Sequence, residues 1–506
     1  MTSGIARFNL NGQYLKISFL VIIIFECLSF LAFTFSPLNQ ALFILIVVAA
    51  FVISLFRLDI GAYILLTELI IGGKGYLFSL DFGHRTLSIR IGLFIAIIAA
   101  TIIQLARKKG TFPRNNVFFS AILVALLAVV YGLVRGYFHG NALVNIFFDA
   151  NGYFYTATAL VFFITISSLP TVERLLQVMY GASLAVSLKT LFILSYFAHS
   201  PSAEAQRAVY TWIRNTGVGE MTDLGHYFFR VFFQSHIFLL FIFFFSLSLL
   251  IIVGKKFFSP GTYRILMLSS FVSGAVIVVN FSRSFWLAAA GTLILFFIFL
   301  VKKWHRNFLQ VAKLSSILAL GVIAELVFLT ALVNFPIPGH SSGNVTTASL
   351  VRERLESGTS ESAVSSRIQL LKPLALQIMK NPLFGSGFGT TVTYKTKDPR
   401  ASAASGGNYT TYAFEWGYLD LLAKLGLIGA AAYLFFSFKI LKTGFHVFRS
   451  AVNPEDQAII FGLILSFIAL LFTHATTPYL NHPLGIGYSL VIASIFALYH
   501  RHPSMS

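Results

Sequence analysis

Long apolar runs separated by short polar connections dominate this 506-residue chain. A helix needs roughly twenty apolar residues to cross the hydrocarbon of a bilayer. About fourteen runs approach that length, and the third is the shortest: 17–35, 38–56, 59–73, 86–106, 117–134, 153–169, 175–197, 229–253, 264–281, 285–301, 308–334, 417–438, 457–475 and 483–500. We therefore predict an all-α, polytopic membrane protein with about fourteen transmembrane helices.

The basic residues between these runs predict the orientation of the chain. Lysine and arginine cluster in four connections, at 107–114, 255–264, 302–306 and 439–449. Cytoplasmic loops carry such an excess of positive charge. If the N-terminus is cytoplasmic, alternating spans bring all four connections and the C-terminus to that same side. We expect both termini in the cytoplasm.

One long polar segment interrupts the pattern and divides the chain into three parts. Residues 1–334 hold the first eleven predicted spans, 335–416 form a large extracytoplasmic loop, and 417–506 hold the last three. Within the loop, 367–380 reads as a short helix that Asn381-Pro382 ends. A loop of this length is usually functional or disordered.

Composition excludes several classes of protein. The chain is 57% hydrophobic and 11% charged, which leaves too little polar surface for a soluble globule of this size. A single cysteine, Cys27, excludes a disulfide framework and a cysteine metal cluster. The net charge of +19 lies mostly in the connections between spans, so we expect no nucleic-acid partner.

An arginine lies at the outer mouth of a predicted helical hairpin, in Ser282-Arg283-Ser284. A guanidinium held there by two spans is suited to bidentate binding of a phosphate. The alternative is that Arg283 is an ordinary interfacial arginine beside Trp286. Its aliphatic stem would then lie along apolar surface.

A glycine-rich turn follows the loop helix, with Gly385, Gly387 and Gly389 in five residues. Glycine permits positive φ and close approach of the backbone, so the amides could face an anion or a sugar. A tight turn that packs the loop against the membrane domain fits the spacing equally well.

A carboxylate flanked by aromatic residues precedes the next span. Glu415 would lie at the membrane surface between Tyr412 and Trp416, with Tyr409 nearby. Partial burial would suit the carboxylate to act as a general base, and the rings could stack on sugars. The alternative is an ordinary carboxylate at a helix N-terminus.

Further external cations are candidate phosphate ligands. Arg367, at the start of the loop helix, is the best second ligand, and other candidates lie near the outer ends of spans or in outer loops: Arg90, Arg230 and Arg214. The external histidines have no metal-site spacing, so we expect no metal and no cofactor.

Three of these stretches occur in the order seen in the O-antigen ligase and O-antigen polymerase superfamily, which this chain resembles over about 264–440. They are the arginine mouth at 282–284, the glycine-rich turn at 381–389, and the Tyr-Leu-Asp-Leu-Leu-Ala-Lys-Leu-Gly-Leu-Ile-Gly helix at 418–429. The resemblance implies a membrane-embedded glycosyltransferase of the GT-C type in a bacterial cytoplasmic membrane. It also implies a glycan donor on a polyprenyl (undecaprenyl) diphosphate and a glycan acceptor.

The resemblance further implies that arginines hold the diphosphate in place of a metal, which fits Arg283 and Arg367. One departure matters: ligases of the family usually carry a His-Asn pair where Glu415-Trp416 stands here. This favours a polymerase of O-antigen, capsule or exopolysaccharide, acting by inversion with Glu415 as base.

Two other functions remain open. A ligase would transfer finished glycan to a lipid or protein, and only the acceptor distinguishes it from a polymerase. A flippase or exporter of the same lipid-linked glycan would be expected to have two similar halves, and we find no internal repeat. A polymerase would have a chain-length regulator as a further candidate partner, besides membrane lipid.

Overall fold

The computed structural model describes residues 8–83, 85–107, 116–200, 202–225, 228–304, 307–336, 346–356, 362–396 and 406–501. Within these ranges the chain is almost entirely helical, with three two-stranded antiparallel sheets. The prediction of an all-α, polytopic membrane protein is confirmed.

Twelve helices among the described residues are long and apolar enough to cross a membrane. They are α1 (Gln13–Thr34), α2 (Ser36–Phe56), α4 (Ile89–Arg107), α5 (Phe119–Phe138), α8 (Leu169–His199), α10 (Ile237–Ile252) with the preceding turn η2 (Gln234–His236), α11 (Pro260–Val279), α12 (Arg283–Trp304), α13 (Phe308–Val333), α17 (Gly417–Ser450), α18 (Pro454–Thr476) and α19 (Pro483–Arg501).

The other two predicted spans are shorter in the structure. The run at 59–73 forms α3 (Leu58–Gly72), whose 15 residues extend only about 22 Å, less than the hydrocarbon thickness. The run at 153–169 forms the 3₁₀ helix η1 (Asn151–Thr158) and α7 (Ala159–Thr165). Both lie mostly buried among the longer helices.

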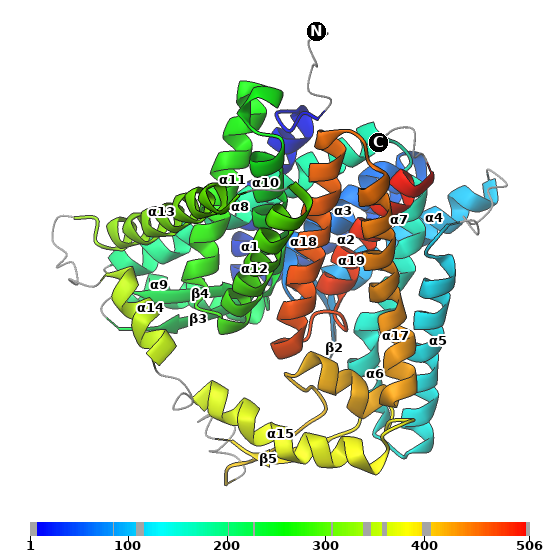
Figure 1. Ribbon diagram of the computed structural model, residues 1–506. Helices are drawn as coiled ribbons and strands as arrows, with labels where there is room; N and C mark the ends of the chain where they lie inside the picture. The colour runs from blue at the N-terminus through cyan, green and yellow to red at the C-terminus, as the bar shows by residue number, and fades with distance from the viewer. Residues whose placement is uncertain are drawn as a thin grey trace.

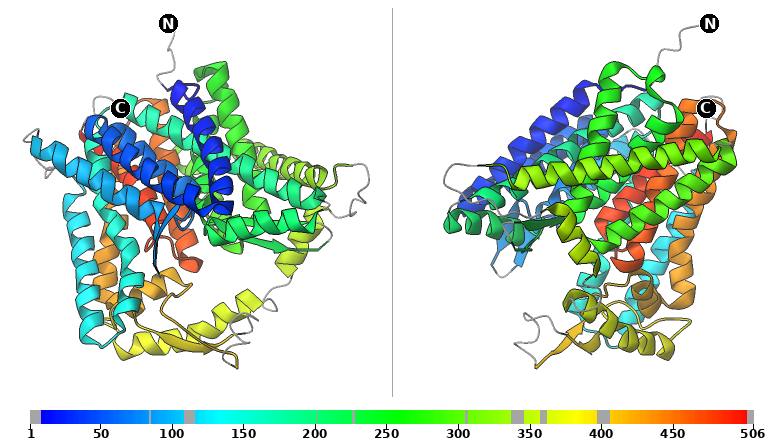
Figure 2. Two further views of the ribbon diagram at one scale, coloured as in Figure 1. Left: turned by 180° about the vertical axis from the view of Figure 1, so that it is seen from behind. Right: turned by 60° about the vertical axis from the view of Figure 1, so that its left-hand side comes forward.

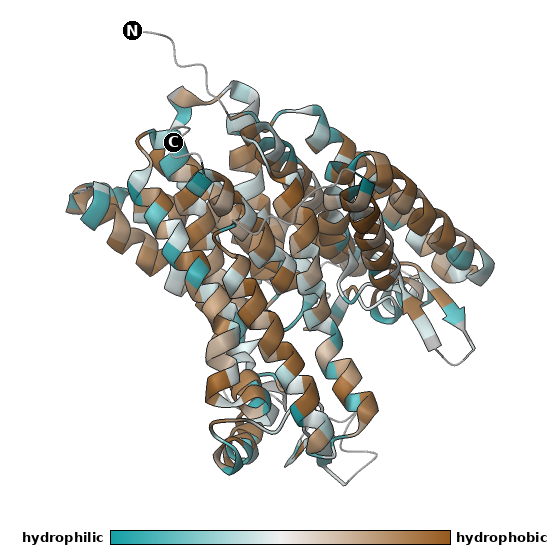
Figure 3. Ribbon diagram, turned by 90° about the vertical axis from the view of Figure 1, so that its right-hand side faces the viewer, coloured by the Kyte–Doolittle hydropathy of each residue, from teal (hydrophilic) through white to brown (hydrophobic). Residues whose placement is uncertain are grey.

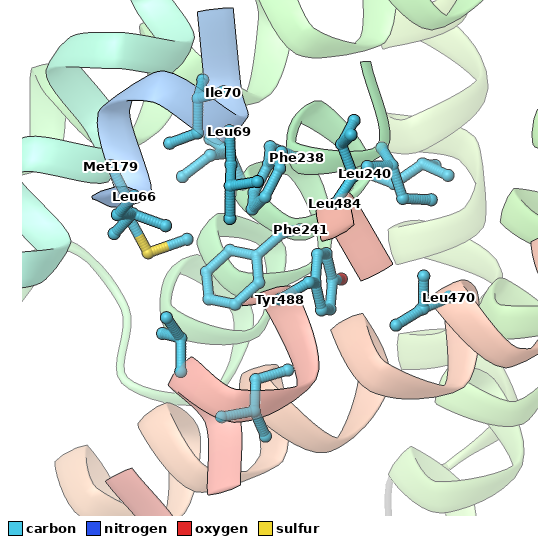
Figure 4. Packing of buried hydrophobic residues seen from close by; sticks show 14 of the residues in the cluster. Leu66, Leu69, Ile70, Met179, Phe238, Leu240, Phe241, Leu470, Leu484 and Tyr488 are labelled. Atoms are coloured by element: carbon cyan, nitrogen blue, oxygen red, sulfur yellow. The ribbon is translucent and has the colours of Figure 1, made fainter. Parts of the chain in front are cut away.

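The helices form a bundle with a buried centre and an apolar outer surface. Most of the apolar stretches of α10, α18 and α19 are buried, whereas those of α2 and α13 are largely exposed. Figure 4 shows the centre, where Phe238 and Phe241 of α10 pack against Tyr488 of α19 and side chains of α3. The long helices are largely hydrophobic in Figure 3, and many of their large apolar side chains are exposed. A bilayer would solvate such faces.

The elements of the long loop lie at one end of this bundle. The last residues of α13 and the first of α17 are Val333 and Gly417, and between them come α14 (Thr347–Glu356), α15 (Ser362–Lys380), β5 (Val392–Lys395) and β6 (Asn408–Thr411). The start of α1 and the end of α19 lie at the opposite end (Figures 1 and 2). The sequence predicts one loop helix starting at 367; the structure has two, and the second starts at Ser362.

Smaller elements complete the same end of the molecule. Strands β1 (Ser79–Phe82) and β2 (Arg85–Ser88) form one hairpin, and β3 (Gly219–Asp223) and β4 (Phe229–Phe233) form another. Short helices α6 (Leu143–Ala150) and α9 (Ala203–Asn215) follow α5 and α8, and these pieces lie around the loop end of the long helices. The turn η3 (Lys255–Phe257) precedes α11 and so lies at the end of that helix opposite the α11–α12 turn.

The glycine-rich turn joins the loop to two spanning helices. Helix α17 is interrupted at Gly426, whose φ of 66° is open to glycine but costly for other residues. The turn supplies partners to the interrupted backbone: the Ser386 amide donates to the Ala423 carbonyl (2.9 Å), and the Leu427 amide donates to the Pro382 carbonyl (2.9 Å). Backbone groups freed inside a membrane helix need such internal partners.

Candidate active site

A cavity of about 740 Å³ lies where the loop elements meet the neighbouring ends of the spanning helices. Its walls come from α9, α12, α14 and α15, the β3–β4 and β5–β6 sheets or their flanks, the segment after α3, and the connection between α18 and α19. Six basic side chains line it, with two acidic ones: Lys74, Arg214, Arg230, Arg283, Arg354, Arg367, Glu220 and Glu415. Of the residues that the sequence predicts, six lie here together: Arg214, Arg230, Arg283, Arg367, Tyr409 and Glu415.

The turn between α11 and α12 is strained. Phe281 is fully buried with φ at 46°, the only non-glycine residue with positive φ among those the structure describes. The Asn280 side chain stabilises this turn by accepting a hydrogen bond from the Ser282 amide (2.8 Å). Such strain persists only where surrounding contacts fix it, and it often marks a functional site. Here it places Ser282 and Arg283 at the cavity, at the N-terminus of α12.

Three guanidinium groups, those of Arg230, Arg283 and Arg354, gather around this turn, and Arg354 Nε donates to the Phe281 carbonyl (3.4 Å). Arg283 donates from Nε (3.2 Å) and Nη2 (2.6 Å) to the carbonyl of Arg354 in α14. Arg230 of β4 donates from Nε to the Asn280 carbonyl (2.8 Å). The backbone therefore fixes these side chains, and the α12 N-terminus adds partial positive charge. Positive groups held in this way are suited to bind an anion of high charge density.

The candidate base is paired with the loop helix. Arg367 of α15 donates from Nε to Glu415 Oε2, and the two side chains are 33% and 51% exposed. The Trp416 indole donates to the Arg367 carbonyl (3.0 Å) and thereby joins α15 to the start of α17. The pair is thus held in place while it remains open to the cavity.

Aromatic side chains form another part of the wall. Tyr394 of β5 and Tyr409 of β6 face each other across the hairpin, with ring centroids 5.8 Å apart and planes at 90°. Both line the cavity, as does Phe232 of β4. Rings in such positions can stack against the apolar face of a sugar.

The connection between α18 and α19 completes the wall with Thr477, Tyr479 and His482. Its hydroxyl and backbone groups are fixed: Thr477 donates to Ser284 (3.0 Å), and the Tyr479 amide donates to Nδ1 of His474 (3.0 Å). Although the ring of His482 opens on the cavity, the surrounding protein and the positive charges of Lys424, Arg90 and Lys74 lower its pKa to about 4. The imidazole is therefore neutral near pH 7.

The remaining predicted residues lie outside the cavity wall. Arg90 is 7% exposed and donates to Glu68 of α3 (2.8 Å). Trp416 packs with Leu370 and Phe414 in a small cluster beneath α15. Tyr412 does not line the cavity, and partial burial raises the pKa of its hydroxyl.

The two predicted glycines pack against helices rather than open on the cavity. The Gly387 amide donates to the Lys424 carbonyl (2.8 Å), and that of Gly385 donates to Asn381 (2.9 Å). A Cβ at Gly387 would lie 2.0 Å from the Gly136 amide nitrogen of α5. The glycines thus allow close approach of three backbones.

A buried group of charges fixes this packing. Lys424 of α17 lies 2.5 Å from both Asp149 of α6 and Asp420 of its own helix. Asp149 also accepts from the Gly389 amide (2.8 Å), and Asp420 accepts from Asn481 beside His482 (2.9 Å). This group, Asp149–Lys424–Asp420, connects α6, the glycine-rich turn, α17 and the cavity wall.

Several cavity residues were not selected from the sequence: Lys74, Glu220, Phe232, Arg354, Tyr394, Thr477, Tyr479 and His482. Lys74 carried a usable signal, because it stands between Gly73 and Gly75 at the outer end of a predicted span. No group of three or more histidine, cysteine, aspartate or glutamate side chains in the described ranges is arranged to hold a metal ion.

Comparison with known proteins identifies the central part of the chain. Residues 265–434 match the O-antigen ligase family. The match runs from α11 to the first half of α17 and includes Arg283, Arg367 and Glu415, and it confirms the resemblance to the O-antigen ligase and polymerase superfamily. No curated protein matches the chain. The match supports a membrane function of the O-antigen ligase or polymerase type, in which a glycan is transferred, and the many apolar helices agree with a multi-pass membrane protein.

Proposed function

We propose that the protein is a polysaccharide polymerase in a bacterial cytoplasmic membrane. It joins oligosaccharide units carried on polyprenyl diphosphate into O-antigen, capsule or exopolysaccharide on the outer face. The observation that carries this proposal is that Arg283, Arg367 and Glu415, from three different elements, line one cavity. The loop elements that line the cavity lie at the end of the bundle opposite the start of α1 and the end of α19 (Figure 1), so cytoplasmic termini would place the cavity outside.

The proposed reaction is a single displacement with inversion. An acceptor hydroxyl attacks the anomeric carbon of the lipid-linked donor and forms the new glycosidic bond. Its proton passes to the Glu415 carboxylate, while the bond from the anomeric carbon to the diphosphate oxygen breaks. Proton acceptance by a placed carboxylate typically contributes about 10²- to 10⁴-fold to rate.

The arginines stabilise the departing diphosphate. Arg283 is directed by the Arg354 carbonyl, and Arg230 by the Asn280 carbonyl, so neither has to reorganise when charge develops on the leaving group. Arg367 orients Glu415 and adds a further positive charge. Guanidinium groups neutralise the leaving group in this scheme, so we propose no metal cofactor. Tyr409 and Tyr394 would hold sugar rings.

Replacement of Arg283 by Ala in a host that lacks its own copy tests this function. We expect high-molecular-weight polymer to disappear from gels of extracted glycan while the protein remains in the membrane. The matched control is Arg352→Ala: Arg352 lies on α14, is 80% exposed, pairs with Glu356 and does not line the cavity. Polymer of normal length from Arg283→Ala cells would remove Arg283 from the mechanism.

A ligase is the second candidate, because the matching family is described as O-antigen ligase. The chemistry at the donor would be the same, and the acceptor would be a lipid or a protein. Supplying lipid-linked units alone distinguishes the two: a polymerase lengthens them, whereas a ligase leaves them unchanged until its acceptor is added.

A further inference from the structure

The cavity carries more positive charge than one lipid diphosphate requires. A diphosphate that links a lipid to a sugar has one negative charge on each phosphate. The turn between α11 and α12 already gathers Arg230, Arg283 and Arg354 around one place. Apart from Arg367, two basic residues of the cavity remain, namely Lys74 and Arg214. They come from elements that are not part of this turn.

Lys74 and Arg214 lie on two segments that the fold joins directly. Lys74 follows α3, and Arg214 lies in the last turn of α9. The Lys74 amide donates to the Gly217 carbonyl (2.9 Å). A Cβ at Gly217, which has φ of 64°, would lie 2.9 Å from Lys74 Cβ and 3.2 Å from Cδ. The lysine stem therefore lies over this glycine, and both residues line the cavity.

Neither cation forms an ion pair with another described residue, although Glu220 of β3 also lines the cavity. By contrast, Arg90, which lies against Gly75 next to Lys74 in the sequence, is paired with Glu68. Cations that share a cavity repel one another unless an anion joins them.

The neighbouring side chain fits a sugar rather than a second diphosphate. His482 lines the same cavity, and Lys74 is one of the charges that keep its ring neutral. A neutral imidazole has one donor and one acceptor nitrogen and so suits a hydroxyl. One ammonium and one guanidinium match a single carboxylate, and Arg binds carboxylates in bidentate fashion.

We propose that Lys74 and Arg214 form a second anion subsite, which binds the carboxylate of an acidic sugar in the glycan. The proposal rests on the proposed function, since the lipid diphosphate is assigned to the turn between α11 and α12. It names the substrate class: the transferred or accepting glycan contains a uronic acid or a sugar of similar charge.

Binding to the full-length protein in nanodiscs tests this subsite with three probes: trigalacturonic acid, neutral galactotriose and farnesyl diphosphate. We expect the wild type to bind trigalacturonic acid at least about tenfold more tightly than galactotriose, because hydrogen bonds to charged groups carry that much selectivity. Lys74→Gln combined with Arg214→Gln should abolish this preference and leave farnesyl diphosphate binding within about twofold. Arg207→Gln is the matched control, an exposed arginine of α9 outside the cavity wall.

Three results would overturn the subsite. The first is equal binding of the two trisaccharides by the wild type, and the second is a preference for trigalacturonic acid that survives in the double variant. The third is a loss of farnesyl diphosphate binding in the double variant as large as its loss of trigalacturonic acid binding, which would assign these cations to the lipid diphosphate. Arg283→Gln separates this proposal from the proposed function. If that variant keeps its affinity for farnesyl diphosphate while the double variant loses the carboxylate preference, the proposed function fails and the subsite stands.

Discussion

Two groups of charged side chains in this protein contain the same chemical types in opposite surroundings. Lys424 and its partners Asp149 and Asp420 have side chains that are 1%, 7% and 1% exposed. Arg367 and Glu415 form an ion pair that is 33% and 51% exposed. The first group has no access to a substrate, whereas the second opens on a large cavity.

Burial decides what each group can do. A buried charge that loses its partner stays desolvated, so the fold itself depends on the pairing. A pair open to solvent contributes little to stability, because water screens it. The Asp149–Lys424–Asp420 group therefore fixes the positions of the turn, α17 and the α18–α19 connection, and the Arg367–Glu415 pair is left to act on a ligand.

The largest effect that we predict is from Lys424→Met. This substitution leaves two buried carboxylates unpaired, which costs about 3–5 kcal/mol in comparable buried pairs. We expect a lower apparent melting temperature in detergent, less protein in the membrane and, as a consequence, no polymer. Thermal unfolding followed by size-exclusion chromatography measures this loss.

Arg57→Met is the matched control for that experiment. Arg57 also pairs with an aspartate, Asp59, but its side chain is 54% exposed. Its loss should leave the melting temperature as in the wild type. If Lys424→Met and Arg57→Met unfold at the same temperature, burial is not what distinguishes the two kinds of pair.

Glu415→Gln should have the opposite profile. The substitution preserves shape and removes the proton acceptor, so the folded protein should be as stable as the wild type. We expect polymer formation to fall about 10²- to 10⁴-fold, the usual contribution of a general base. Incorporation of labelled lipid-linked units measures the rate, with Glu353→Gln on the exposed face of α14 as control. Near wild-type activity in Glu415→Gln would exclude Glu415 as the base.

The spans were predictable from sequence because a bilayer demands little beyond length and apolar character. The two shorter ones, α3 and η1–α7, show the limit of that reasoning. These helices are surrounded by other helices rather than by lipid, so their length does not have to match the thickness of a membrane. The first loop helix, α14, which was not predicted, lacks an apolar stripe strong enough to reveal it, and its position depends on contacts with α13 such as the hydrogen bond from the Thr347 amide to Thr330 (2.9 Å).

The cavity was only partly predictable, for a different reason. Recognisable local sequence patterns contain three of its residues, so these could be predicted: Arg283, Arg367 and Glu415. Lys74 and His482 are separated by 408 positions in the sequence (482 − 74). No local sequence pattern therefore indicates that they share a cavity. Arg90 has the same charge and a similar predicted place as Arg230, yet it pairs with Glu68. Only the packing of distant elements decides which cations reach the cavity.

The smallest predicted effect concerns His482 and acid. Its folded-state pKa of about 4 lies below the ordinary value of 6.5, so the unfolded chain binds the proton more readily than the folded protein. This residue therefore contributes a loss of stability as pH falls from about 6.5 towards 4. Between pH 7 and pH 5, we expect the melting temperature of the His482→Gln variant to fall less than that of the wild type. His139→Gln, at the exposed end of α5, is the control. If the melting temperature of His482→Gln falls as much as that of the wild type, protonation of His482 does not destabilise the folded protein. The surrounding cations would then act too weakly to hold the ring neutral.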